Sequence, residues 1–281
     1  MLRLMVVGAT GSLGSAVARE AVSAGHEVSL LVRTPSKVPG EIASRASIHK
    51  ADLTRLGTAE LADLIRGHDA LINCAGLVTE GHAFVALIDR VVSSAETLPG
   101  AERPVSWFLA GAALLDLDER RRRGIQLPKV KTTYWPHGAN FERLRRSNLD
   151  WRLLCPGPMV DQPAIGLERL RVSCDRLPVR LPRFARLLPA PLLLPLFAAS
   201  IPEMIVPYAD AASVMLANLS PRGPMMHHRV GIALPPGMRG KKEQWAAPSN
   251  QRRTGKSTAG SNGLPDVTSH PCVRSDCWVS E

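Results

Sequence analysis

The chain has 281 residues, a formal net charge of +10 at pH 7, and a hydrophobic content of 45%. This length and composition suit a folded protein with one sizeable core and argue against overall disorder. The positive charge favours anionic partners, but the arginine run "ERRRRG" (119–124) lacks interleaved aromatic residues and is predicted to be an exposed loop, not a nucleic-acid site.

The first half of the chain alternates short apolar runs with amphipathic ones. Strands are predicted at 2–7, 26–32, 48–52, 69–75, 104–110 and 150–157. Helices are predicted between them at 12–24, 60–67, 83–96 and 140–148. This alternation predicts an α/β fold of the Rossmann type, a doubly wound parallel sheet with helices on both faces. Sheets of this kind bind ligands beyond the carboxyl ends of their strands.

The second half is irregular and rich in proline. Residues 157–206 are predicted to form an irregular substrate-side segment, followed by a helix at 208–219 and a strand at 227–234. The apolar stretch 184–206 is long enough to suggest a membrane span, but its four prolines each cost a helix ~3 kcal/mol. We therefore expect short helical pieces that form an apolar lid.

A single domain is predicted for residues 1–234. The remaining residues, 235–281, are rich in Gly, Pro, Ser and Lys and are predicted to be a disordered tail. The five cysteines form no C-x-x-C pair, and no histidine pair completes a metal pattern, so no metal site is expected. Scattered thiols fit a reducing compartment, and the first strand leads directly into a glycine turn, so a cytoplasmic location is expected.

A glycine-rich turn, "VVGATGSLGSAV", joins the first predicted strand to the first helix. Its first glycine permits a tight turn, the second admits a pyrophosphate near the backbone, and the third allows close helix packing. Amides at the start of the helix then face the anion. No Lys-Ser/Thr pair follows, which excludes a P-loop. The predicted phosphate-binding residues are Gly8, Thr10, Gly11, Ser12, Leu13 and Gly14.

The end of the second strand is predicted to select the cofactor. In "LVRTPSK", Arg33 and Lys37 stand where an NAD-dependent enzyme places a carboxylate, so the expected cofactor is NADPH, with its 2′-phosphate on Arg33. The alternative is that Arg33 is a surface residue without a role. Further cofactor contacts are predicted at the next two strand ends, namely Asp52, Leu53, Cys74, Ala75 and Gly76.

These motifs, together with "HGANFERLRRSNLDWRLLCPGPMVDQP" at 137–163, resemble the atypical short-chain dehydrogenases. The specific resemblance is to NAD(P)H-binding proteins similar to biliverdin-IXβ reductase, also called NADPH-flavin reductase, and it covers about residues 2–232. It implies a Rossmann fold, NADPH as the hydride donor, and a flavin or another planar acceptor over the nicotinamide. It also places Pro156 and Gly157 beside the nicotinamide.

The chain departs from related dehydrogenases at two positions. Gly138 replaces the lysine of a Tyr-x-x-x-Lys step that begins at Tyr134, and Gly111 stands near the place of a serine or threonine. Reduction of a carbonyl needs a positioned acid, whereas reduction of a flavin can take its remaining proton from water. Tyr134 and His137 are the predicted catalytic residues, with His137 at a helix start after Pro136. Plain packing roles for both are the alternative.

Three functions follow from these patterns. The first is an NADPH-dependent oxidoreductase that reduces a flavin, a quinone or a related planar acceptor. The second is a regulator that senses NADP(H) without catalysis on the same fold. The third, an epimerase of nucleotide sugars, needs the missing lysine. The expected partner is a small planar molecule, with no nucleic acid and no stable membrane insertion, and the oligomeric state is left open.

Overall fold

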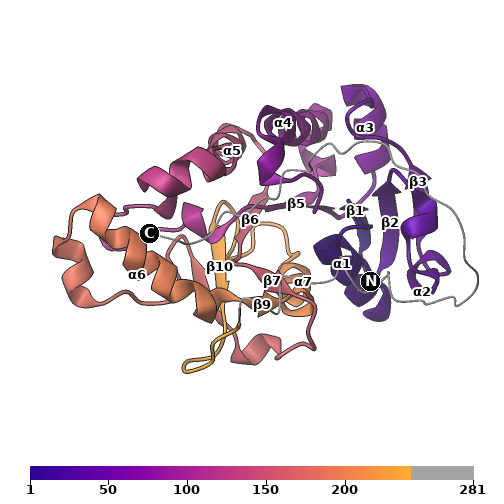
Figure 1. Ribbon diagram of the computed structural model, residues 1–281. Helices are drawn as coiled ribbons and strands as arrows, with labels where there is room; N and C mark the ends of the chain where they lie inside the picture. Colours follow the sequence, from indigo (N-terminus) through magenta and orange to yellow (C-terminus); the bar gives the residue numbers. More distant parts are fainter. Residues whose placement is uncertain (242–281) are drawn as a thin grey trace, which may run out of the picture. The chain divides into compact units, whose positions relative to one another are not determined.

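Eight strands form one sheet in a computed structural model that describes residues 1–241 (Figure 1). Their order is β3-β2-β1-β4-β5-β6-β10-β8, and neighbouring strands are parallel except β8 and β10. The strands are β1 (Arg3–Val7), β2 (Glu27–Val32), β3 (Ser47–Lys50), β4 (Ala70–Asn73), β5 (Val105–Leu109), β6 (Trp151–Cys155), β8 (Arg171–Cys174) and β10 (Arg229–Ala233). The Rossmann-type prediction is confirmed, with one antiparallel edge strand that was not predicted. A separate parallel pair joins β7 (Met159–Val160) to β9 (Val206–Pro207).

Helices cover both faces of the sheet (Figure 1). One face carries α1 (Ser12–Ser23) and α7 (Tyr208–Leu216), with the short α2 (Gly40–Ala43) beside α1; the other carries α3 (Thr58–Ile65), α4 (His82–Thr97) and α5 (Pro128–Arg145). In β1, Leu4 and Val6 pack into the first layer, and Met5 and Val7 pack into the second. Burial on both faces explains why central strands such as β1 are largely apolar.

Helix α5 starts earlier than predicted. The expected helix was 140–148, but α5 runs from Pro128 to Arg145, with Pro136 inside it. Pro128 stands at the first helical position of α5. Proline is favourable there because the first N–H groups of a helix have no intrahelical acceptor and the fixed φ of proline suits a helix. Packing against α4 and the neighbouring turns offsets the interior proline. His137 therefore lies in the middle of a helix, and the prediction that it stands at a helix start is wrong.

Short helices build most of the apolar stretch 184–206, as predicted, and another lies earlier in the substrate-side segment. They include α6 (Leu193–Ser200) and 3₁₀ turns at Leu167–Arg169, Arg183–Leu187, Ala190–Leu192 and Ile201–Met204. Earlier 3₁₀ turns are Pro35–Lys37, Val78–Glu80, Gly100–Glu102, Ala112–Leu114 and Gly124–Gln126. Within residues 1–241, no helix combines the length and the apolarity needed to cross a bilayer.

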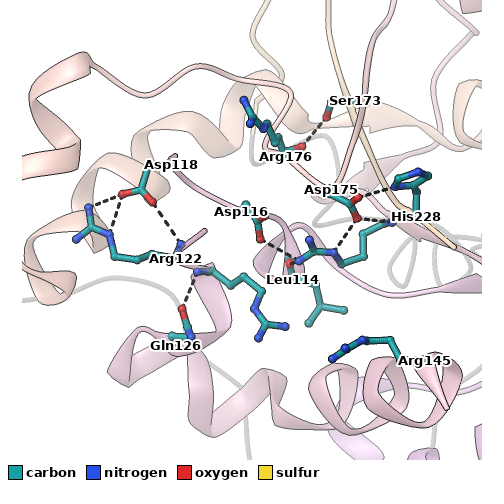
Figure 2. Close-up of polar contacts among 12 residues, drawn as sticks. Leu114, Asp116, Asp118, Arg122, Gln126, Arg145, Ser173, Asp175, Arg176 and His228 are labelled. Atoms are coloured by element: carbon teal, nitrogen blue, oxygen red, sulfur yellow. Dashed lines mark hydrogen bonds and ion pairs between the residues drawn. The ribbon is translucent and has the colours of Figure 1, made fainter. Parts of the chain in front are cut away.

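The arginine run at 119–124 is only partly an exposed loop. Arg122 is half-buried and pairs with Asp118 through its Nε at 2.8 Å, and it donates further bonds to the carbonyls of Ala185 and Leu188. Figure 2 shows the Asp118 carboxylate turned toward the Arg122 guanidinium. The run therefore ties the chain after β5 to the segment predicted to be a lid.

A second ionic network ties the same chain to β10. The Arg229 guanidinium lies 3.1 Å from both the Asp116 and the Asp175 carboxylates and donates to the carbonyl of Leu114. Burial raises the pKa of Asp175, but hydrogen bonds from His228 and Arg229 outweigh it and hold that pKa below its usual value. Figure 2 shows the Asp175 and His228 side chains facing one another.

Asp210 anchors the substrate-side segment to α7. Its carboxylate is fully buried and accepts hydrogen bonds from the backbone amides of Ile165, at 2.9 and 3.1 Å, and of Gly166, at 3.0 Å. This contact supports the structural role expected for an aspartate at the start of this helix.

Replacing Asp210 by alanine is expected to lower the free energy of unfolding by roughly 2–3 kcal/mol, because two buried amides lose a charged acceptor. Chemical denaturation measures the change. Asp161→Ala, at an exposed aspartate near the same segment, is the matched control. Equal stability of the two variants would contradict the anchoring role.

The described residues fall within one compact unit. Residues 235–241 form neither helix nor strand, yet the Gly240 amide donates to the carbonyl of Pro202 at 2.7 Å and Arg239 donates to the carbonyl of Ala199 at 3.0 Å. The predicted disordered tail, 235–281, falls mainly on residues 242–281, which lie outside the described residues.

Candidate functional site

The carboxyl edge of the sheet brings the predicted cofactor turns together. Beyond the strands, the Gly8 amide donates to the carbonyl of Leu31 at 3.2 Å, and the Cys74 amide donates to the carbonyl of Val7 at 2.9 Å. The turns after β1, β2 and β4 are therefore adjacent. They meet where the strand order reverses, on either side of β1, which is the place where such sheets bind ligands.

The glycine turn depends on close backbone approaches. Gly8 has a φ of +79°, and a Cβ atom on it would lie 2.8 Å from the Ala75 amide nitrogen. A Cβ atom on Gly14 would lie 2.3 Å from the Gly8 carbonyl oxygen. At Gly11 the nearest atom would be that oxygen at 3.5 Å, an ordinary contact. Gly8 and Gly14 are thus required by the protein's own packing, whereas Gly11 leaves space for a ligand.

The first turn of α1 presents free amides. Among residues 1–241, the N–H groups of Ser12, Leu13 and Gly14 have no acceptor, and no side chain caps the helix. Thr10, Gly11 and Ser12 are exposed, so an anion can approach. These amides and the positive end of the helix dipole suit a pyrophosphate.

Two basic residues follow β2. Arg33 and Lys37 are exposed, and neither side chain has a hydrogen bond or ion pair within the described part of the chain. Asp52 lies close enough to Arg33 to feel its charge; hydrogen bonds from Thr54 are the main reason that the pKa of Asp52 is lowered. Leu53, the next residue in the chain, is buried. Strand β3 ends at Lys50, so Asp52 stands in the turn after the strand and not at its end as predicted.

The turn after β4 lies against the glycine turn. The buried Asn73 side chain closes it through two bonds to Ala75, both 3.4 Å long. A Cβ atom on Gly76 would lie 2.3 Å from the Phe84 ring. Burial raises the pKa of the Cys74 thiol to about 12, which agrees with an inert thiol.

The predicted catalytic residues lie on α5, beside the end of β5. The rings of Tyr134 and His137 stack 6.1 Å apart, and the Phe84 ring meets His137 edge-on at 5.6 Å. A Cβ atom on Gly111 would lie 3.6 Å from Nε2 of His137. His137 thus faces Gly111, where the resemblance implies a serine or threonine hydroxyl, and no hydrogen bond joins His137 to Tyr134.

Neither side chain is a ready proton donor near neutral pH, for opposite reasons. Burial lowers the pKa of His137 to about 4, so the ring is neutral at physiological pH. Burial also raises the pKa of Tyr134 above its usual value. Gly138 stands where the lysine of a Tyr-x-x-x-Lys step would lie, so that lysine is not present to lower the pKa of Tyr134.

Acidification is expected to destabilise the protein through His137. Protonation favours the unfolded state, where the pKa is near 6.5, so the group's contribution is complete above pH 6.5 and is lost as pH falls toward 4. The loss is about 3 kcal/mol. Urea unfolding of wild type and His137→Leu across this range measures it. An equal fall in both proteins would contradict the assignment.

The end of β6 packs against the substrate-side segment. The Pro156 carbonyl accepts from the Ala112 amide at 2.8 Å, and a Cβ atom on Gly157 would lie 2.6 Å from the Met204 carbonyl oxygen. Two large apolar side chains of this segment, Phe184 and Leu187, are 56% and 71% exposed.

A concave region of about 570 Å³ lies at the opposite, amino edge of the sheet. Its arginines are engaged: Arg3 pairs with Asp69, and Arg66 pairs with Asp63 and Glu102. The glycine turn is not part of its lining. This region is therefore not a candidate for the dinucleotide.

Comparison with known proteins decides the family. The model of the NAD(P)H-binding family matches residues 8–176, more than half of the chain. This chain is a member of the NAD(P)H-binding family. An uncharacterized protein of Bacillus subtilis (strain 168), YwnB, is 27% identical over 167 residues, which are 57% of this chain and 74% of YwnB.

Solved structures of several relatives share the fold. A protein of Streptococcus pneumoniae TIGR4 named as a candidate NADH-flavin reductase superposes with a TM-score of 0.62 and 22% identity over 83% of this chain and 100% of that chain. ChuY, an anaerobilin reductase from Escherichia coli O157:H7, gives 0.57 and 15% over 85% of this chain and 100% of its own. At these identities the likeness establishes the fold alone.

The family assignment confirms a nicotinamide cofactor. The matched residues contain the glycine turn, both basic residues after β2 and the candidate catalytic residues, but not the segment 184–206. One buried polar residue in this region was missed from the sequence. Asn140 lies one turn beyond His137, and its spacing of three from a candidate catalytic residue could have indicated it.

Proposed function

We propose that this NAD(P)H-binding protein is an NADPH-dependent oxidoreductase that reduces a flavin, a quinone or a similar planar acceptor. The observation that carries the proposal is a neutral, buried His137 beside Gly111 at the nicotinamide end of the site. At this end His137 offers a hydrogen bond and the rings of Phe84 and Tyr134 offer flat surfaces, but neither His137 nor Tyr134 is an activated acid.

The other end of the site favours NADPH over NADH. The side chains of Arg33 and Lys37 stand after β2 with no carboxylate paired to either of them in the described residues. A guanidinium attracts a 2′-phosphate, whereas NAD-dependent enzymes hold the ribose hydroxyls with an acidic side chain. Free amides of Ser12 and Leu13 would hold the pyrophosphate.

NADPH, when bound, supplies a hydride. The chain's own residues would position the acceptor. Pro156 and Gly157 would border the nicotinamide face, and the packed rings of Phe84, Tyr134 and His137 would form a wall. His137 would offer Nε2, the ring nitrogen that faces Gly111, to a polar edge of the acceptor. Because neither Tyr134 nor His137 is an activated acid, reduction of a carbonyl by these residues would be slow, whereas a flavin can take its proton from water.

Two fold neighbours add support. They are named as reductases of flavin and of anaerobilin. A non-catalytic NADP(H) sensor is the second candidate, because the missing hydroxyl at Gly111 and the missing lysine at Gly138 also suit a protein that binds the cofactor without turnover.

The test has two steps. Calorimetric titration with NADPH and NADH comes first, and we expect tighter binding of NADPH. NADPH oxidation is then followed with FMN, FAD, a quinone and a panel of ketones. Turnover with planar acceptors and none with ketones is the expected result. Tight NADPH binding without turnover on any acceptor would favour the sensor.

A further inference from the structure

Helix α5 buries two unpartnered polar side chains one turn apart. His137 is 8% exposed and Asn140 is 5% exposed. Nδ1 of His137 and both polar atoms of the Asn140 amide are buried and have no hydrogen-bond partner among residues 1–241. Buried polar atoms in folded proteins are almost always bonded, so this pair calls for an explanation.

The two side chains are within mutual reach. Residues three apart on a helix are neighbours on one face, with Cβ atoms about 5–6 Å apart. Asn140 follows His137 toward the amino edge of the sheet and shares its helix face. The terminal torsion of asparagine is broad, so rotation of the amide would let its N–H approach Nδ1.

The titratable groups on the elements packed against α5 are engaged elsewhere. The turns and helices packed against α5 are α4 and the 3₁₀ turns at 78–80, 112–114 and 124–126. On these elements Asp89 and Glu96 bond Arg143, Arg90 bonds the carbonyl of Leu56, Glu80 accepts from the Leu77 amide, and His82 packs on Trp135. The titratable side chain stacked on His137 is Tyr134, and the two form no hydrogen bond.

We propose that Asn140 is a positioning residue that donates its side-chain N–H to Nδ1 of His137 and holds the neutral ring as the Nε2–H tautomer. Nε2 is the ring nitrogen that faces Gly111, so the proton is presented toward the site. The tautomer is a property of the protein itself; its use on an acceptor rests on the proposed function. Asn140 touches neither cofactor nor acceptor in this scheme.

Nitrogen NMR of imidazole-labelled protein tests the tautomer directly. His137 is assigned by comparison with His137→Leu. In wild type near neutral pH, we expect a protonated Nε2 and an unprotonated Nδ1. In Asn140→Leu, which has a similar volume, we expect a mixture of both tautomers. Ser94→Ala is the control, because Ser94 is also buried and unpartnered but lies on α4. Its spectrum should match wild type.

Kinetics supply a second readout. With the best acceptor, Asn140→Leu should lower kcat/KM by roughly five- to tenfold, the loss of one hydrogen bond, with unchanged NADPH affinity. Asn140→Gln, which keeps the amide, should recover part of it. A proton on Nδ1 in wild type, or an unchanged spectrum in Asn140→Leu, would overturn the inference. The spectrum alone decides the positioning role, and turnover alone decides the proposed oxidoreductase function.

Discussion

Gly11→Ala is expected to weaken cofactor binding by roughly 10- to 100-fold while the fold stays intact. A Cβ atom here meets only the Gly8 carbonyl oxygen at 3.5 Å, so the protein itself accommodates the substitution. The methyl group would instead stand between the pyrophosphate and the open amides of α1, and charge-assisted hydrogen bonds of this kind contribute ~1.5–3 kcal/mol each. Calorimetry with NADPH measures the affinity, and chemical denaturation should show a change below about 1 kcal/mol.

Two other glycine-to-alanine variants serve as comparisons for Gly11→Ala. Gly14→Ala places a Cβ atom 2.3 Å from a backbone oxygen and should destabilise the fold as well, by ~1–3 kcal/mol. Gly40→Ala, at a glycine with no atom within 4 Å of an added Cβ, should change neither property. If Gly11→Ala bound NADPH as wild type does, the turn would not be the pyrophosphate site.

Arg33→Glu is expected to lower NADPH affinity by about 100-fold or more and NADH affinity by less than about threefold. The substitution removes an attraction to the 2′-phosphate and adds a repulsion, and each charge-assisted contact contributes ~1.5–3 kcal/mol. A new carboxylate at this position can accept the ribose hydroxyls of NADH. Parallel titrations of the two coenzymes measure the selectivity.

Arg146→Glu is the matched control for net charge. Arg146 is exposed at the end of α5, at the opposite edge of the sheet from the glycine turn, and its substitution changes the total charge equally. The Arg146→Glu variant should prefer NADPH over NADH to the same extent as wild type. Equal losses for NADPH and NADH in Arg33→Glu would refute the 2′-phosphate role and leave Arg33 as a surface residue.

Local sequence patterns were sufficient to predict the elements that are expected to bind the dinucleotide. The β1 strand, the glycine turn and α1 were predicted within a residue or two, because strand propensity, the glycine spacing and helix periodicity are local properties. The parallel direction of the strands follows from the same alternation. The expected cofactor residues come together at one edge because parallel strands all end there.

The surroundings of the residues expected to face the acceptor depend on contacts between distant segments of the chain. Pro136 locally favours a helix boundary, but packing on α4 carries α5 through it, which turns His137 from a helix-start residue into a buried one. Asn140 acquires significance only when that burial removes water from both side chains. The antiparallel β8 and the Asp210 anchor join residues far apart in the chain, which no local pattern encodes. The amino-acid sequence alone therefore predicted the Rossmann-type fold class and the turns expected to hold the cofactor, while long-range packing decided the surroundings of the candidate catalytic residues, because burial and hydrogen-bond partners arise only once distant segments meet.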